Sequence, residues 1–290
     1  MSYDLYFRSD APPSPQEVRD YFSGRAHYEV RPTQAWYENP TTGVYFSFGF
    51  DEGEGEALAL SFNLNYNRPS FFGLAAEPEV ATFIAHFNLG IDDPQSDGMG
   101  DGPYSREGFL RGWDAGNRFG VSVMKERGSA DVPTLPASTN TGIWRWNAMR
   151  EAYLDFLGSL EMLPTFVPTI MLLAAEDDPR TVFTTVVWGE AMAFMLPKVD
   201  RIVLPQEDKS MLWLPYAKVA DYLEALPLRP AEYTFDLDGR TWQTGMGHRV
   251  IEDNLTSGAL HDLLTRGGEP IPKLGRVAPD RVLDRELLEG

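Results

Sequence analysis

Carboxylate side chains gather in one stretch of this chain, where they could bind a cationic group. From residue 51 to residue 101 the only basic side chain is Arg68. The acids of this stretch are Asp51, Glu52, Glu54, Glu56, Glu77, Glu79, Asp92, Asp93, Asp97 and Asp101. A field of one sign over so long a segment attracts cationic ligands. We therefore predict a cationic protein partner. The predicted contact residues are Glu52, Glu54, Glu56, Asp92, Asp93, Asp97 and Asp101.

The histidines give little sign of a catalytic or metal site. They are His27, His86, His248 and His261, and none has a second ligand at metal-binding spacing. His86 lies among apolar residues, which favours a partly buried structural role. His248 follows a glycine turn and precedes Arg249, a pair that could bind an anion. The alternative to a binding protein is therefore a hydrolase-like enzyme, with a site of dispersed Asp, Glu, His and Arg residues.

Nucleotide and metal motifs are not evident either. The sequence has no nucleophile elbow, no P-loop and no dinucleotide-binding glycine pattern after a strand. Residues 92–102 combine aspartates with glycines, so their oxygens could bind calcium, but their spacing departs from the twelve-residue EF-hand frame. A solvated Asp/Gly turn is the simpler interpretation. We expect no cofactor and no metal.

Charge and composition narrow the class of protein. The net charge of -18 disfavours nucleic acid and anionic membrane surfaces as partners. The absence of cysteine excludes disulfides, thiolate catalysis and iron–sulfur clusters. The first residues do not form a signal peptide, and the most apolar stretch, 166–175, is about half a membrane span. We therefore expect a soluble, cytoplasmic globular protein.

The first 128 residues predict an alternation of strands and helices. Residues 3–7 alternate as a strand does, and Ser14, Pro15 and Glu17 predict a capped helix start. An antiparallel meander is expected next, with strands at 34–38, 44–50 and 57–66. Two helices should follow, at about 78–87 and 105–125.

Four glycines recur at every fourth position of the second predicted helix, and they are Gly108, Gly112, Gly116 and Gly120. Each costs about 1 kcal/mol relative to alanine inside a helix. A bare helix face that another backbone or an aromatic ring approaches closely would offset that cost. The alternatives are packing within the chain, docking of another helix, and a segment that is not one continuous helix.

The second half reads as strands with fewer helices. A Gly/Pro/Ser/Thr-rich segment precedes a helix at 143–160 and an apolar strand at 167–174. Strands 182–188 and 191–196 should form a hairpin, followed by a strand at 201–204 and a helix that begins at Pro215. A second hairpin is expected around Asp238-Gly239. A short helix at 257–265 then leads to a surface tail of about twenty residues.

Both halves mix antiparallel strands with flanking helices and lack regularly spaced crossovers. This pattern predicts the α+β class, with antiparallel sheets and flanking helices in two packed subdomains. The predicted domains are residues 1–128 and 143–290, and residues 129–142 are the predicted linker or long loop.

Three stretches of the first half resemble a protein family. They are Tyr-Asp-Leu-Tyr-Phe at 3–7, Gln-Ala-Trp-Tyr-Glu at 34–38 leading into Gly-Val-Tyr-Phe-Ser-Phe at 43–48, and Gly-Met-Gly-Asp-Gly-Pro-Tyr at 98–104. They are similar to bacterial cytoplasmic immunity proteins encoded beside polymorphic or contact-delivered toxins. The resemblance covers residues 1 to about 125 and assigns no functional residue. It implies a protein that covers the active site of a toxin domain, and an acidic surface would suit the basic cleft of a nuclease toxin.

Overall fold

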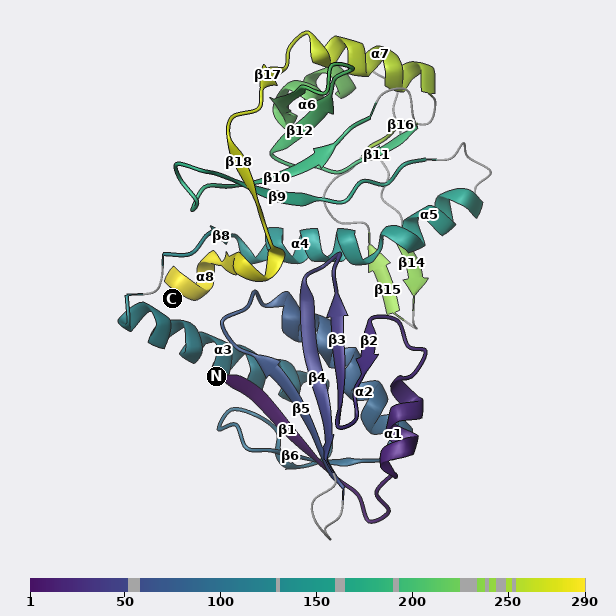
Figure 1. The fold of residues 1–290 in the computed structure, drawn as a ribbon, viewed down its shortest axis with the longest axis vertical. Helices are drawn as coiled ribbons and strands as arrows, with labels where there is room; N and C mark the ends of the chain where they lie inside the picture. The colour runs from purple at the N-terminus through teal and green to yellow at the C-terminus, as the bar shows by residue number, and fades with distance from the viewer. Residues whose placement is uncertain are drawn as a thin grey trace. The chain divides into compact units, whose positions relative to one another are not determined.

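The computed structural model describes residues 1–51, 58–128, 131–159, 165–189, 193–224, 234–237, 240–243, 249–251 and 254–289. It confirms the α+β class, with largely antiparallel sheets and flanking helices (Figure 1). The chain divides into two compact units, Met1–Ala137 together with Asp280–Gly290, and Ser138–Pro279. Among the described residues, no helix has the length and apolar character needed to cross a membrane.

The first unit is built on a seven-stranded antiparallel sheet in the order β2-β3-β4-β5-β1-β6-β7. Its strands are β1 (Ser2–Arg8), β2 (Tyr28–Val30), β3 (Gln34–Asn39), β4 (Val44–Asp51), β5 (Ala59–Asn65), β6 (Gly90–Asp93) and β7 (Gly100–Gly102). The predicted meander is confirmed as β3, β4 and β5. Strand β1 is first in the chain but lies between β5 and β6, so it brings N-terminal side chains beside the acidic stretch.

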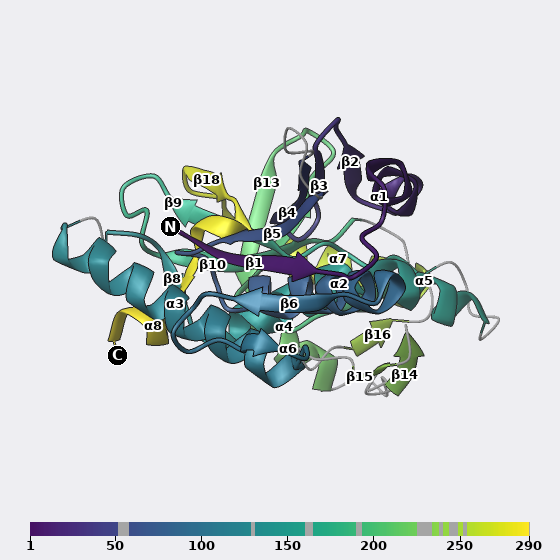
Figure 2. The same ribbon diagram turned by 90° about the horizontal axis from the view of Figure 1, so that it is seen from below.

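Helices cover one face of this sheet because its strands alternate between apolar and polar side chains. The helices are α1 (Pro15–Phe22), α2 (Phe71–Phe87) and α3 (Arg106–Glu126). Phe22 of α1 and Phe83 of α2 both pack on Phe48 of β4, with ring centroids 5.0 and 4.9 Å away. Helix α1 lies beside β2 at one edge of the sheet (Figure 1, Figure 2). The opposite face carries polar side chains such as Ser47 and Asn63, together with the rings of Trp36 and Tyr45.

The helix starts were predicted with mixed success. The capping box at α1 is confirmed, since Ser14 Oγ accepts from Glu17 N at 3.3 Å and Glu17 Oε2 accepts from Ser14 N at 2.7 Å. Helix α2, however, begins at Phe71 and contains Pro78 in its interior. The prediction placed Pro78 at the start because proline favours the first turn, whereas buried apolar residues extend the helix upstream of it.

The glycine repeat of α3 is explained by packing within the first unit. A Cβ on Gly112 would lie 2.9 Å from Tyr3 Oη, and one on Gly116 would lie 2.6 Å from Tyr66 Cε1. The tyrosine rings therefore occupy the space that side chains would need. Of the three alternatives, the structure supports a continuous helix whose bare face packs inside the chain.

The second unit contains a six-stranded sheet in the order β17-β13-β12-β10-β9-β18. These strands are β9 (Met171–Ala175), β10 (Val182–Val187), β12 (Arg201–Pro205), β13 (Met211–Pro215), β17 (Glu269–Pro270) and β18 (Leu274–Val277). Its helices are α4 (Ala137–Ala148), which starts at the last residue of the first unit's main segment, α5 (Arg150–Ser159), α6 (Tyr216–Glu224) and α7 (Asn254–Thr265). Strands β14 (Thr234–Leu237) and β15 (Arg240–Gln243) form the predicted second hairpin.

The other predicted hairpin is wrong. Strand β10 pairs with β9 and, in parallel, with β12, while β11 (Phe194–Leu196) pairs with β16 (Arg249–Ile251). The strands were located by their apolar runs, and an apolar run does not identify its partner. The turn residues Gly189-Glu190 suggested that β10 pairs with β11, whereas β10 pairs with β9 and β12 and β11 pairs with β16.

The last residues are not a surface tail. Strand β19 (Leu283–Asp284) pairs with β8 (Thr134–Leu135), and α8 (Arg285–Glu289) follows. Leu287 is buried, and the buried Asp284 carboxylate accepts a hydrogen bond from Ser70 N at 2.8 Å. The predicted linker contains β8 and the start of α4, and Asp280–Gly290 belongs to the first unit rather than to the second domain.

Buried tyrosines make stability sensitive to alkaline pH. Burial raises the pKa of Tyr153, on α5, to about 12 from its ordinary value of 10.0. The unfolded chain therefore loses this proton first, so the contribution is fully present below pH 10 and is lost as the pH rises toward 12. We expect the free energy of unfolding to fall by about 2–3 kcal/mol from this group. Urea denaturation across this pH range measures the free energy of unfolding. In Tyr153→Phe this free energy should fall less steeply between pH 10 and 12 than in the wild type. The same pH dependence in both proteins would contradict the contribution of Tyr153.

Candidate functional site

The ends of four strands bring carboxylates together at one end of the first unit's sheet. In the strand register Asp51 pairs with Ala59, and Arg8 pairs with Gly90. Because Phe7 pairs with Leu60, Arg8 and Ala59 are neighbours as well. We call the exposed carboxylates at this place the acidic end, defined as Asp10, Asp51, Asp92 and Asp101. It lies at the bottom of the sheet in Figure 1.

Arg8 joins two of these carboxylates. Its Nη2 lies 2.5 Å from Asp92 Oδ2 and its Nη1 lies 2.8 Å from Asp101 Oδ2. Asp92 and Asp101 face each other across β6 and β7, where like charges repel. The hydrogen bond that Arg8 donates to Asp92, and then the charges of both carboxylates, raise the pKa of Arg8. The three side chains are 56%, 34% and 69% exposed, so these ion pairs stabilise the fold little and a partner can compete for them.

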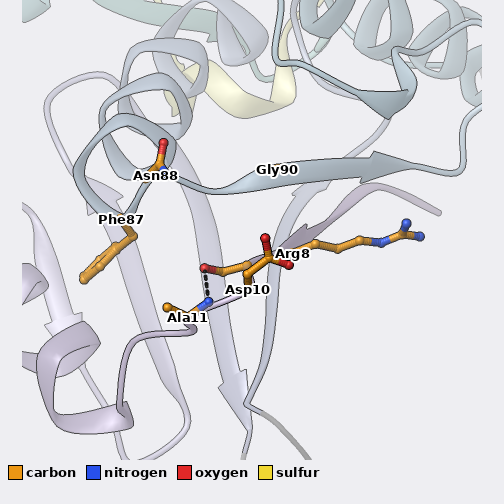
Figure 3. Close-up of a pocket in the computed structure, with 7 residues that line it drawn as sticks. Arg8, Asp10, Ala11, Phe87, Asn88 and Gly90 are labelled. Carbon is orange, nitrogen blue, oxygen red and sulfur yellow. Dashed lines mark hydrogen bonds between the residues drawn. The ribbon is translucent and has the colours of Figure 1, made fainter.

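A hollow of about 520 Å³ lies next to Arg8 (Figure 3). Its lining residues are Arg8, Ser9, Asp10, Ala11, Phe87, Asn88 and Gly90. Phe87 and Asn88 stand on one side and Asp10 on the other, while the Arg8 side chain extends away from them. Ser9 Oγ accepts a hydrogen bond from Ala11 N at 3.2 Å, which shapes the wall beside Asp10.

The chemistry of this hollow favours a positively charged group. Helix α2 ends there, with Asn88 in the left-handed conformation at φ 50°, and a helix C-terminus carries partial negative charge. The exposed carboxylate of Asp10 adds a full negative charge. The half-buried ring of Phe87 can contact a cation through its face. A cationic group such as an ammonium or a guanidinium therefore suits the charge of this hollow.

Asp93 was predicted as a contact residue, but the structure turns it inward. Its side chain is 3% exposed and accepts three hydrogen bonds, from Tyr3 Oη at 2.7 Å, Gln95 N at 3.0 Å and Met99 N at 2.9 Å. Burial and the Asp93 carboxylate raise the pKa of Tyr3. A Cβ on Gly98 would lie 2.6 Å from Asp93 Oδ1, so a glycine is needed there. Asp93 closes the turn between β6 and β7 and cannot reach a partner.

Two other acids of the sequence cluster also have internal partners. Glu77 is 2% exposed and accepts from Tyr104 Oη at 2.9 Å and from Arg106 Nε at 3.3 Å. Glu79 accepts from Arg25 Nη2 at 2.7 Å. Both arginines come from outside residues 51–101, so counting charges along the sequence overestimated the local excess.

The remaining predicted residues have different positions. Asp97 is exposed in the turn between β6 and β7, and its carbonyl accepts from Arg111 Nε at 2.9 Å. Glu52, Glu54 and Glu56 lie outside the described residues, between Asp51 and Leu58 in the sequence. Of the predicted contacts, the structure thus brings only Asp92 and Asp101 into the acidic end.

The structure does not describe the side chains of His248 and Arg249, the two residues named for an alternative site. His248 lies outside the described residues, and of Arg249 only its place at the start of β16 is described. Within the described ranges, no group of three or more histidines and carboxylates is placed to hold a metal ion.

Sequence reasoning missed Arg8, Asp10, Phe87 and Asn88. Arg8 and Asp10 lie outside the acidic stretch of the sequence, and only the position of β1 between β5 and β6 brings them to it. Asn88 was detectable in principle, because asparagine at a helix C-terminus commonly adopts the left-handed conformation.

Comparison with protein-family models, with curated proteins and with solved structures gave no match.

Proposed function

We propose that this chain is an immunity-type binding protein that neutralises a cationic toxin domain by covering it with the acidic end. One observation supports this most strongly. Asp51, Asp92 and Asp101 lie at the end of one sheet, Asp10 lines the hollow next to Arg8, and Arg8 neutralises only part of their charge.

The electrostatics of this surface suit rapid and selective association. Carboxylates grouped at one end of a rigid sheet steer a basic surface into register and repel acidic competitors. The hollow beside Asp10 gives the partner a place to insert a cationic side chain. Glu52, Glu54 and Glu56 follow Asp51 in the sequence and add to the negative charge of this stretch of the chain. The resemblance of residues 1 to about 125 to immunity proteins agrees with this role.

The function can be tested by co-expressing the chain with the product of the reading frame beside its gene. We expect the wild type to restore growth to cells that this product poisons. The combined variant Asp10→Lys, Asp51→Lys, Asp92→Lys and Asp101→Lys should not, because it reverses the charge of the acidic end. A matched variant changes four exposed acids elsewhere to lysine, namely Glu126, Asp177, Glu207 and Glu289, and should still protect. Equal protection by all three proteins would exclude the acidic end as the neutralising surface.

A further inference from the structure

A second hollow, of about 340 Å³, lies where β2 and β3 form the edge of the first unit's sheet. Its lining residues are His27, Tyr28, Glu29, Trp36, Glu38 and Pro40. Glu38 pairs with Tyr45 at the start of β4, whereas the acidic end adjoins Asp51 at the end of β4. The two sites therefore lie at opposite ends of the same strand, and an inference about one does not depend on the other.

An indole ring and a carboxylate are held side by side in this hollow. Trp36 Nε1 donates to Glu38 Oε2 at 3.2 Å, which fixes the carboxylate at the edge of the indole ring. Tyr45 stacks on Trp36 with ring centroids 5.6 Å apart and an interplanar angle of 18°. One face of the indole is thus covered by Tyr45. Trp36 is partly exposed and lines the hollow together with the exposed Glu38, so the indole surface that Tyr45 leaves uncovered is available to a ligand.

Glu38 supplies the uncompensated negative charge of the hollow, because the other carboxylate of its lining, Glu29, is paired. Arg31 binds Glu29 through Nε at 3.0 Å and Nη2 at 3.1 Å, so Glu29 is compensated. Asn39 Oδ1 accepts from the backbone of the following turn, which orients its Nδ2 toward His27 Nε2 at 3.3 Å.

We propose that this hollow binds the guanidinium group of an arginine. A guanidinium is planar, so it can stack on the open face of Trp36 while its N–H groups donate to Glu38. An ammonium group is a compact point charge and cannot make both contacts in one plane. A quaternary ammonium ion has no N–H group to donate to Glu38, so it would make only the contact with the ring.

The proposal can be tested with capped arginine, N-acetyl-arginine amide, titrated into the full chain. The signal is the indole N–H resonance of Trp36, which its absence in Trp36→Phe identifies. We expect saturable shifts with a dissociation constant in the millimolar range, about 1–10 mM, as suits one stacked ion pair. Glu38→Gln should weaken binding by about tenfold, and Glu126→Gln, an exposed acid of α3, should not change it.

Capped lysine and free arginine, titrated in the same way, show whether the hollow prefers arginine over lysine and a polypeptide over the free amino acid. The lysine derivative with the same caps should bind several-fold more weakly than capped arginine. Free arginine carries an α-ammonium and an α-carboxylate where the capped form has two amides. Tighter binding of the capped form therefore indicates an arginine within a polypeptide, and tighter binding of free arginine indicates the amino acid itself. Equal affinity for lysine and arginine, or an affinity for capped arginine that Glu38→Gln leaves unchanged, would overturn the proposal. Glu38 is exposed, so this variant tests binding without disturbing the core.

Discussion

Replacing Asp93 with alanine is expected to lower the free energy of unfolding by about 3–5 kcal/mol. The substitution leaves Tyr3 Oη and the backbone N–H groups of Gln95 and Met99 without their acceptor. The carboxylate is buried, and burying donors without partners costs free energy at each of them. The turn between β6 and β7 should loosen, because Asp93 is the side chain that closes it. Urea denaturation followed by circular dichroism measures the change.

The neighbouring residue supplies the control for this prediction. Asp92 is the same residue type one position earlier, but it is partly exposed and pairs with the exposed Arg8. Asp92→Ala should therefore change stability by about 1 kcal/mol or less. Equal destabilisation by Asp92→Ala and Asp93→Ala would mean that the inward position of Asp93 is incorrect.

Gly73→Ala is the second substitution with a large expected effect. A Cβ on Gly73 of α2 would lie 2.6 Å from Nε1 and 2.9 Å from Cγ of Trp113 on α3. Trp113 is 2% exposed and stacks on Tyr66, so the indole has no room to move aside. Overpacking of this kind costs about 1–3 kcal/mol and outweighs the helix propensity gained from alanine.

The same substitution at an open helical glycine should have the opposite sign. Among the described residues, no atom outside the local helix backbone lies within 4 Å of a Cβ on Gly158 of α5. Gly158→Ala should therefore leave stability unchanged or raise it by up to about 1 kcal/mol. Thermal and urea unfolding of both variants make the comparison. A Gly73→Ala protein with the same free energy of unfolding as the wild type would show that α2 and α3 do not approach each other as closely as described.

The sequence predicts local elements of this protein well, because their signals are local. The capping box at Ser14 needs only neighbouring residues, and the alternation of β3 to β5 is visible within each strand. The α3 glycines also predicted a close approach correctly. The identity of the approaching rings, Tyr3 and Tyr66, could not be predicted because they lie far away in the sequence.

The candidate site was harder to predict because it depends on strand order. Arg8 and Asp10 reach the acidic end only because β1 inserts between β5 and β6. Adjacent acids also take opposite directions, since successive strand residues face opposite sides of a sheet. Asp92 is therefore exposed beside Arg8, and Asp93 is buried against Tyr3. A count of charges along the sequence does not include either effect.

The most direct test of the proposed function is calorimetric titration of the purified chain with the basic product of the neighbouring reading frame, at low and at physiological salt. We expect tight one-to-one binding that weakens as the salt concentration rises, because exposed carboxylates provide the attraction. Reversing Asp10, Asp51, Asp92 and Asp101 to lysine should weaken binding by on the order of 100-fold or more and remove most of its salt dependence. The same affinity and the same salt dependence in wild type and variant would contradict the acidic end as the binding surface.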